Sequence, residues 1–275
     1  DIANSGVEMS LAYNDKIGAV DFESRLVYSR NVNKVKKLVH NYNTGIDNQV
    51  INFTETSAGG GYIREGDSMG DVYITKVLKR DATGAIAVAA DGSLSSMDLP
   101  NGERLRIGNT NPDFTLGWRN NISWKGLNLS FLINARVGGI VTSETQAVLD
   151  QFGVSKATAD ARDRGYVEVA GGQRVDPQKY YEVVANQQLL GYYYYSATNV
   201  RLQNVSLTYT LPKTLLGQGW PGITVGFIAN NLWMIYNKAP FDPEIAASTG
   251  TYGQGSDYFS APSLRNIGFS LKLNF

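Results

Sequence analysis

Hydrophobic and polar residues alternate along seven segments of this chain. The clearest is the last, where Ile267, Phe269, Leu271, Leu273 and Phe275 alternate with polar residues or glycine. Successive side chains of a β-strand point to opposite faces, so each segment predicts a strand with one apolar and one polar face. The predicted strands span residues 6–14, 20–30, 114–124, 127–137, 199–211, 223–236 and 266–275. The predicted fold class is all-β, with consecutive strands antiparallel.

One of these segments breaks its own alternation. The apolar set that begins at Val205 and ends at Leu211 is out of phase with Val200 and Leu202. One extra residue inserted into a strand shifts its phase in this way. The sequence therefore predicts a β-bulge or a change of structure between the two sets.

The connections between the strands alternate in length. Those after the first, third and fifth strands are short, whereas those after the second, fourth and sixth strands are the long inserts 31–112, 138–198 and 238–261. Outer-membrane barrels have short periplasmic turns and longer extracellular loops. The pattern therefore predicts a transmembrane antiparallel β-barrel wall whose three inserts are extracellular.

The long inserts carry signals of their own. Ser143 followed three residues later by Gln146 predicts a capping box at the start of a helix. Asp176 followed by Pro177 predicts the N-cap and first residue of a second helix, which continues over 178–185. In the first insert, residues 72–78 predict a small hairpin within an otherwise irregular segment.

An up-and-down sheet of seven strands cannot close, because its first and last strands would run in the same direction. Two open edges in lipid would leave backbone groups unsatisfied, at several kcal/mol each. The chain also begins at Asp1 with no signal peptide ahead of it. We therefore expect residues 1–275 to be the C-terminal portion of a larger barrel, with the remaining strands upstream.

Composition excludes several classes of function. The 25 basic residues balance the 25 acidic ones, so nothing indicates a nucleic-acid partner. The absence of cysteine excludes disulfides, thiolate metal sites and cysteine nucleophiles. No apolar run is long enough for a transmembrane helix. We expect no cofactor, no metal and no enzymatic activity.

Four blocks of the chain resemble SusC/RagA-type TonB-dependent transporters. The block at 107–115 (IGNTNPDFT), followed by 125–131 (KGLNLSF), is similar to that family's "GNPNPDFTYG…KGFDLSFF" region. Residues 194–207 are similar to "DATNIRLRELSLGY" and residues 230–244 to "NLF…YDPE". Residues 261–275 resemble "PRTFTLGLNLTF". With the opening hairpin, these blocks cover most of the chain in family order.

The resemblance implies the last seven strands of a barrel of about 22 strands, whose N-terminal plug is absent from this chain. It implies import of large nutrients, oligosaccharides or peptides, across the outer membrane of a Gram-negative, Bacteroidota-like bacterium. The implied partners are a SusD-like surface lipoprotein, and TonB-ExbB-ExbD acting through the missing part. It also implies that Phe275 is the terminal aromatic residue read by the barrel-assembly machinery.

The strand pattern and the family resemblance together indicate candidate site residues. Aromatic side chains can stack on sugar rings or hold peptides, so the run Tyr192, Tyr193, Tyr194 and Tyr195 is the candidate for substrate contact, with belt residues or packing as the alternative. On the polar faces of the strands, the predicted lumen-facing charges are Glu23, Arg25, Arg119, Arg136 and Lys272. We expect these charges to pair with one another and with the plug. The residues expected to meet lipid are Trp118, Trp124, Phe131, Phe227 and Phe269.

Two other motifs favour ordinary structural interpretations. Gly66–Gly70 fits the nucleophile pattern G-x-S-x-G, but the single histidine, His40, lies upstream of Ser68 rather than downstream. Asp81 and Asp91 lie in polar turns without the spacing of a calcium loop.

Two other classes of protein remain open. One is a self-contained small outer-membrane barrel that acts as an adhesin, an enzyme or a binding protein, which would need an eighth strand. The other is a soluble β-sandwich that acts as a binding module, which the lipid-facing alternation disfavours.

Overall fold

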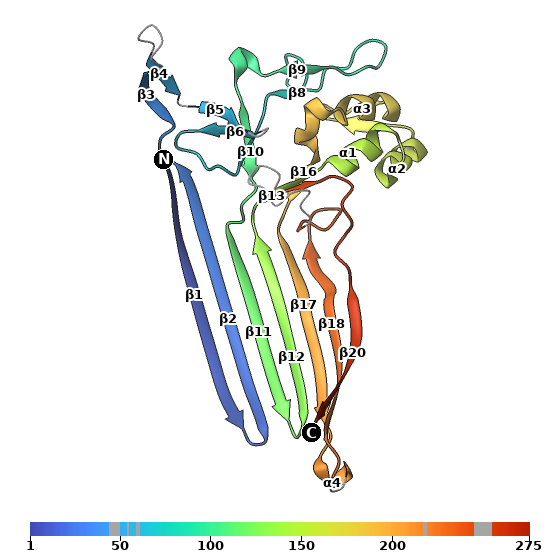
Figure 1. Ribbon diagram of the computed structural model, residues 1–275. Coiled ribbons are helices and arrows are strands. Elements are labelled where there is room, and N and C mark those ends of the chain that lie inside the picture. The colour runs from blue at the N-terminus through green and yellow to red at the C-terminus, as the bar shows by residue number, and fades with distance from the viewer. Residues whose placement is uncertain (44–49, 54, 59–60, 217–218, 245–254) are drawn as a thin grey trace.

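A computed structural model of the chain describes residues 1–43, 50–53, 55–58, 61–216, 219–244 and 255–275. Its main feature is an antiparallel sheet of seven long strands in the order β1-β2-β11-β12-β17-β18-β20 (Figure 1). The strands are β1 (Ile2–Ile17), β2 (Val20–Val35), β11 (Phe114–Trp124), β12 (Leu127–Val137), β17 (Asn199–Thr210), β18 (Gly222–Asn237) and β20 (Asn266–Asn274). The predicted all-β, antiparallel fold is confirmed, and so are the positions of all seven strands.

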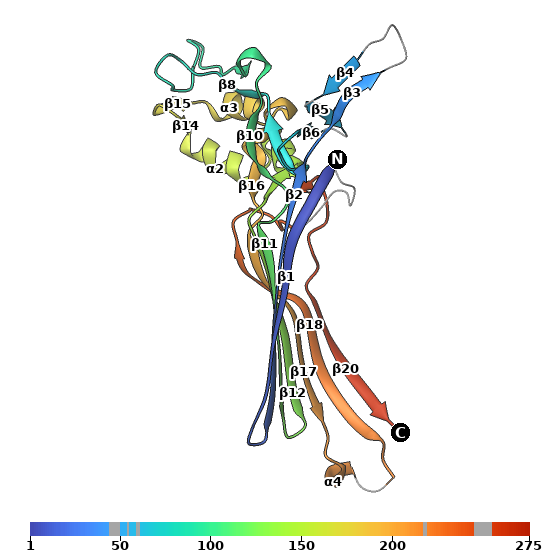
Figure 2. The same ribbon diagram turned by 90° about the vertical axis from the view of Figure 1, so that its left-hand side faces the viewer.

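The seven-stranded sheet is open. Among the described strands, β1 pairs only with β2 and β20 only with β18. The sheet forms a curved wall whose two edges stay apart (Figures 1 and 2). The connections 17–20, 124–127 and 210–222 lie at one end of the wall, together with the C-terminus, and the three long inserts lie at the other end (Figure 1). The predicted segregation of short and long connections is therefore confirmed.

The strand register aligns apolar residues with apolar residues across the wall. One row runs from Leu11 through Leu26, Trp118 and Ile133 to Leu202. A second row, nearer the short turns, joins Leu129, Leu207, Phe227 and Phe269. Many of these side chains are exposed, with Leu11 at 71% and Phe269 at 88%. A continuous exposed apolar face of this size marks a contact with lipid or with another protein.

The predicted β-bulge lies at Gln203. Leu132 pairs with Asn204 and Ile133 with Leu202, so Gln203 has no register partner on β12, although its side chain accepts a hydrogen bond from Asn134 of that strand. The extra residue restores the phase, because it places Leu202 on the same apolar face as Val205. The same region is irregular on the other side, where the register with β18 also shifts.

The first insert contains short strands in small sheets. They are β3 (Val39–Asn43), β4 (Val50–Phe53), β5 (Glu55–Ala58), β6 (Gly61–Arg64), β7 (Asp71–Ile74), β8 (Lys76–Leu78), β9 (Ser96–Asp98) and β10 (Leu105–Asn109), with a 3-10 helix η1 (Pro100–Gly102). The prediction of a hairpin over 72–78 is wrong. In the structure β7 pairs with β10 and β8 with β9, because each short strand finds a partner further along the chain.

The second insert is mainly helical. It contains β13 (Ile140–Ser143), α1 (Glu144–Gln151), α2 (Lys156–Arg164), β14 (Val167–Val169), β15 (Gln173–Val175), α3 (Pro177–Val184), η2 (Gln187–Tyr193) and β16 (Tyr194–Ser196). The remaining elements are α4 (Lys213–Leu216), in the turn after β17, and β19 (Ser256–Asp257). Among the described residues, no helix has both the length and the apolar content needed to cross a membrane.

The helix starts were predicted in part. The side chains of Ser143 and Asp176 accept bonds from the N–H groups of Gln146 and Lys179, as N-caps do. The full capping box at Ser143 is not formed, since the Gln146 side chain donates to Asp150 instead, at 2.7 Å. The helix α2 was not predicted. Its cap, Ser155, is as regular as the other two, but α2 has few apolar residues.

The first and second inserts share one hydrophobic core. Its buried residues come from the first insert (Leu78, Ile86, Leu94) and from the second (Ala147, Val169, Val175, Val184, Ala185, Leu189, Tyr193). The third insert joins them through β19, which pairs in parallel with β13. The described parts of the three long connections therefore lie together above the wall (Figure 1).

Candidate functional site

The predicted lumen charges all lie on the polar face of the wall. In the register, Arg25 is directly opposite Arg119, and Glu23 is opposite Asn121. Lys272 is opposite Thr224 on β18, and Arg136 is opposite Thr115. Because side chains alternate between faces, each of these charges points away from the apolar rows. That this face lines a lumen stays a prediction.

These charges do not pair with one another. Within the described part of the chain, Glu23, Arg25, Arg119 and Lys272 form no ion pair. Arg136 Nη2 donates to the backbone oxygen of Thr110 at 2.6 Å. The expected mutual pairing is therefore wrong for the described residues. Like charges directly opposite each other destabilise a sheet, so the Arg25–Arg119 pair is suited to an acidic partner from elsewhere.

The four tyrosines are divided between the core and the surface of the insert. Tyr193 is 3% exposed, and its hydroxyl donates to Asp150 Oδ2 at 2.9 Å. The Tyr192 hydroxyl accepts from the Leu78 N–H at 3.3 Å, and its side chain is 40% exposed. Tyr194 and Tyr195 are half-buried on β16, where Tyr195 stacks edge-to-face on Phe241. Three of the four therefore pack within the protein, and substrate contact by this run stays a prediction.

Asp150 and Tyr193 form the polar centre of the insert. Burial raises the pKa of the Tyr193 hydroxyl, and the neighbouring Asp150 carboxylate raises it further. Asp150 is itself 4% exposed, and its other oxygen accepts from Gln146. A buried carboxylate is stable only when its oxygens are hydrogen-bonded. The pair therefore ties η2 to α1.

We expect Tyr193→Phe to destabilise the insert by about 1–3 kcal/mol, because it leaves one oxygen of a buried carboxylate without its donor. Limited proteolysis of the assembled protein, read as the rate of cleavage within 138–198, measures this effect. Tyr194→Phe is the matched control, since its hydroxyl has no hydrogen-bond partner among the described residues. Equal cleavage rates for the two variants would show that the Asp150 bond contributes nothing.

Three of the resemblance blocks meet at Arg201. Its guanidinium donates to Asp242 Oδ1 at 2.7 Å and lies 3.5 Å from Glu244 Oε2. Asp242 also accepts from the Ser263 hydroxyl. The Arg201 and Asp242 side chains are 6% and 12% exposed. These contacts therefore hold the third insert against the first residues of β17. Arg201 is not identified as a functional residue by the sequence analysis.

The first block contributes to a similar polar cluster inside the first insert, where it joins β10 to β7. Asp71, 8% exposed, accepts from Arg106 at 2.6 Å and from Asn109 at 2.7 Å. At the start of the second insert, Gly138 has a φ of +80°, and a Cβ there would overlap the Asp113 carboxylate. Only glycine fits that conformation and that space. Residues of the blocks thus join the third insert to β17 at Arg201 and Asp242, and join two strands of the first insert at Asn109.

The remaining motifs have local structural roles. Ser68 lies in the turn before β7, where its hydroxyl accepts from the Gly70 N–H. His40 Nε2 is 2.7 Å from Glu65 Oε1, well separated in sequence from Ser68. The Asp81 carboxylate accepts bonds from Thr83, and the Asp91 carboxylate accepts bonds from Ser93, each within its own turn. These groups do not form a catalytic constellation.

The open sheet, the apolar face and the segregated inserts define a portion of a β-barrel wall. Comparison with known proteins shows which class of protein has a similar sequence and fold. No protein-family model matches the chain. It is 26% identical, over its whole length, to TonB-dependent receptor P3 of Formosa agariphila, and 27% identical over 63% of its length to TonB-dependent receptor P39 of the same organism. It spans 29% and 17% of those relatives.

Solved structures agree on the fold. The RagAB peptide importer in its "open-open" state matches with a TM-score of 0.70 and 20% identity, and in its "closed-closed" state with 0.66 and 18%. Each match covers all of this chain and 29% or 30% of the solved one. The predicted resemblance to the C-terminal part of a SusC/RagA-type TonB-dependent transporter is confirmed.

Proposed function

We propose that this chain supplies part of the barrel wall and the outer loops of a TonB-dependent transporter that imports oligosaccharides or peptides across the outer membrane. The observation that carries the proposal is the open wall with a continuous apolar face. A sheet with two unpaired edges is stable in lipid only when further strands cover those edges. The match to relatives more than three times as long supports the same conclusion.

The proposed orientation places the inserts 31–112, 138–198 and 238–261 outside the cell. The asymmetry of the connections supports it, since long loops of such barrels are extracellular. Residues 1–275 would then be the C-terminal portion, completed by a plug and earlier strands. Protease added to intact cells should cut within the inserts and spare the turns at 17–20 and 124–127. Cleavage at those turns alone would reverse the orientation.

The proposed partners are a SusD-like surface lipoprotein, TonB-ExbB-ExbD and membrane lipid. The solved structure that this chain resembles is named a RagAB peptide importer, which supports a peptide as one class of cargo. The predicted role of Phe275 in assembly belongs to the same proposal. Its side chain is fully exposed at the end of the wall that carries the short turns (Figure 1).

Uptake measurements test the proposal. A strain that lacks the transporter should lose uptake of a labelled oligosaccharide or peptide cargo, and the full-length gene should restore it. Inactivation of TonB should abolish the restored uptake. Uptake that persists without TonB would contradict the proposal. A heat-modifiable, stable monomer formed by residues 1–275 alone would favour the self-contained small barrel instead.

A further inference from the structure

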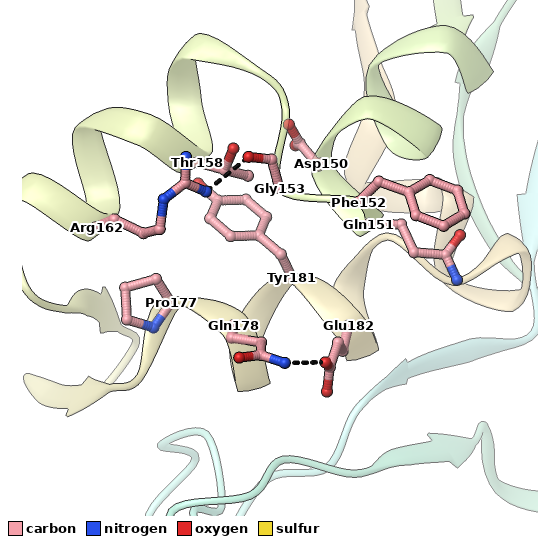
Figure 3. A pocket seen from close by; sticks show the side chains of 10 residues that line it. All are labelled: Asp150, Gln151, Phe152, Gly153, Thr158, Arg162, Pro177, Gln178, Tyr181 and Glu182. Atoms are coloured by element: carbon pink, nitrogen blue, oxygen red, sulfur yellow. Dashed lines mark hydrogen bonds between the residues drawn. The ribbon is translucent and has the colours of Figure 1, made fainter.

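A cavity of about 240 Å³ lies among the three helices of the second insert (Figure 3). It is bounded by the C-terminal end of α1, the turn at 151–153, α2 and α3. None of the residues that line it belongs to the buried hydrophobic core of the inserts, so the cavity is not a defect of that core. No role described above uses it.

Several hydrogen-bonding groups at the cavity are unused. Arg162 donates Nη1 to the Gly153 carbonyl at 2.7 Å, and forms no ion pair with any described residue. The side chain of Gln151 forms no hydrogen bond within the described part of the chain. Glu182 accepts from Gln178 through one oxygen only, at 2.7 Å. The wall therefore offers both donors and acceptors to a ligand.

The charges at the cavity favour a neutral ligand. Two carboxylates, Asp150 and Glu182, share the wall with one guanidinium, Arg162. Both Asp150 oxygens already accept bonds from Gln146 and Tyr193. An anion would face Glu182, and a cation would face Arg162. A group that both donates and accepts without net charge, such as a hydroxyl, meets neither penalty.

Two aromatic side chains complete the wall. Tyr181 projects from α3 toward the turn that carries Gly153 (Figure 3). Phe152 is 73% exposed and lies in that turn. The negative face of an aromatic ring attracts polarised C–H groups. The volume is below the range of roughly 300–1,000 Å³ typical for drug-sized ligands, which suits one ring rather than an extended chain.

We propose that this cavity binds a single neutral sugar ring of a glycan, with its hydroxyl groups on Arg162, Gln151 and Glu182 and its apolar C–H groups on both Tyr181 and Phe152. The site lies on the insert and is separate from the polar face of the wall. It would hold one residue of a glycan at the cell surface. The inference rests on the proposed extracellular position of the insert, and it does not require that the cargo itself be a glycan.

The experiment uses the full-length transporter, purified in an amine-oxide detergent so that no sugar headgroup competes. Saturation-transfer NMR and titration follow binding of the methyl glycosides of glucose, galactose, mannose and xylose. We expect at least one to bind. Phe152→Ala and Tyr181→Ala should each weaken that binding about tenfold, as truncation of a contact residue does.

Val154→Ala is the matched control, because Val154 lies in the same turn and is 67% exposed, but does not line the cavity. It should leave the affinity unchanged. The highly exposed Phe152 also keeps the test valid if Tyr181→Ala misfolds. An equal loss with Val154→Ala, no binding by any of the four glycosides, or preferred binding of glucuronate or a dipeptide would each overturn the inference. Intact TonB-dependent uptake alongside such a result would leave the proposed function standing.

Discussion

Arg201→Ala is expected to lower the free energy of unfolding by about 3–5 kcal/mol, because it leaves the enclosed Asp242 carboxylate without its cation. Asp242 is 12% exposed on its side chain and depends on the Arg201 bond at 2.7 Å. The midpoint of urea unfolding of the assembled transporter, followed by tryptophan fluorescence, measures the loss. Lys16→Ala is the control, since the Lys16–Asp21 pair is 68% and 61% exposed and should contribute little. Equal shifts of the urea midpoint for both variants would show that the buried Arg201–Asp242 pair contributes no more to stability than the exposed Lys16–Asp21 pair.

The Arg201–Asp242 pair should also make the stability of the protein depend on pH. Burial acts to raise the pKa of Asp242, but the bonds from Ser263, the Glu244 N–H and Arg201 outweigh it and hold the pKa below its ordinary 3.8. The stability from a depressed carboxyl pKa is present above the ordinary value and is lost as the pH falls through the folded value. The difference in free energy of unfolding between the wild type and Asp242→Asn should therefore disappear below about pH 4.

Leu207→Arg is expected to destabilise the protein in a bilayer by up to about 2–4 kcal/mol, the cost of a cation on the lipid face of a barrel at the midplane, which falls toward the interfaces. Leu207 lies on the apolar face between Leu129 and Phe227 in the register. The yield and urea midpoint of the transporter folded into lipid vesicles report this cost. Because lipid contact is itself proposed, the result also tests whether this face meets the membrane.

Ser206→Arg provides the matched control one residue away. Ser206 is on the polar face, opposite Ser130 and Ile228. A cation there remains in a polar environment, so we expect a change within about 0.5 kcal/mol. A larger loss for Ser206→Arg than for Leu207→Arg would reverse the assignment of the two faces.

The strands were predictable because their signal is local. A period of two is set by each strand's own geometry, and the register then follows from tight turns such as Lys125-Gly126. Even the β-bulge at Gln203 was visible as a change of phase around Leu202. The sorting of short and long connections needed only their lengths.

The contacts of the inserts were not predictable in the same way. Leu78 and Val184 lie in one core although about a hundred residues separate them in sequence. Tyr193 looked like its neighbours in a run of tyrosines, yet only its hydroxyl meets Asp150. The cap of α2 at Ser155 was present in the sequence, but the helix carries too few apolar residues to show a period.

The sequence by itself determined the wall: seven two-faced strands, their order, their uneven connections and a sheet that cannot close alone. Each of these depends on residues that are neighbours in the chain. Only the tertiary structure decided which polar groups pair, as at Arg201 and Asp242, and which aromatic side chains stay exposed, as at Phe152. Those outcomes depend on segments that meet only after the chain has folded, because the burial and the partner that fix a polar group's energy come from distant residues.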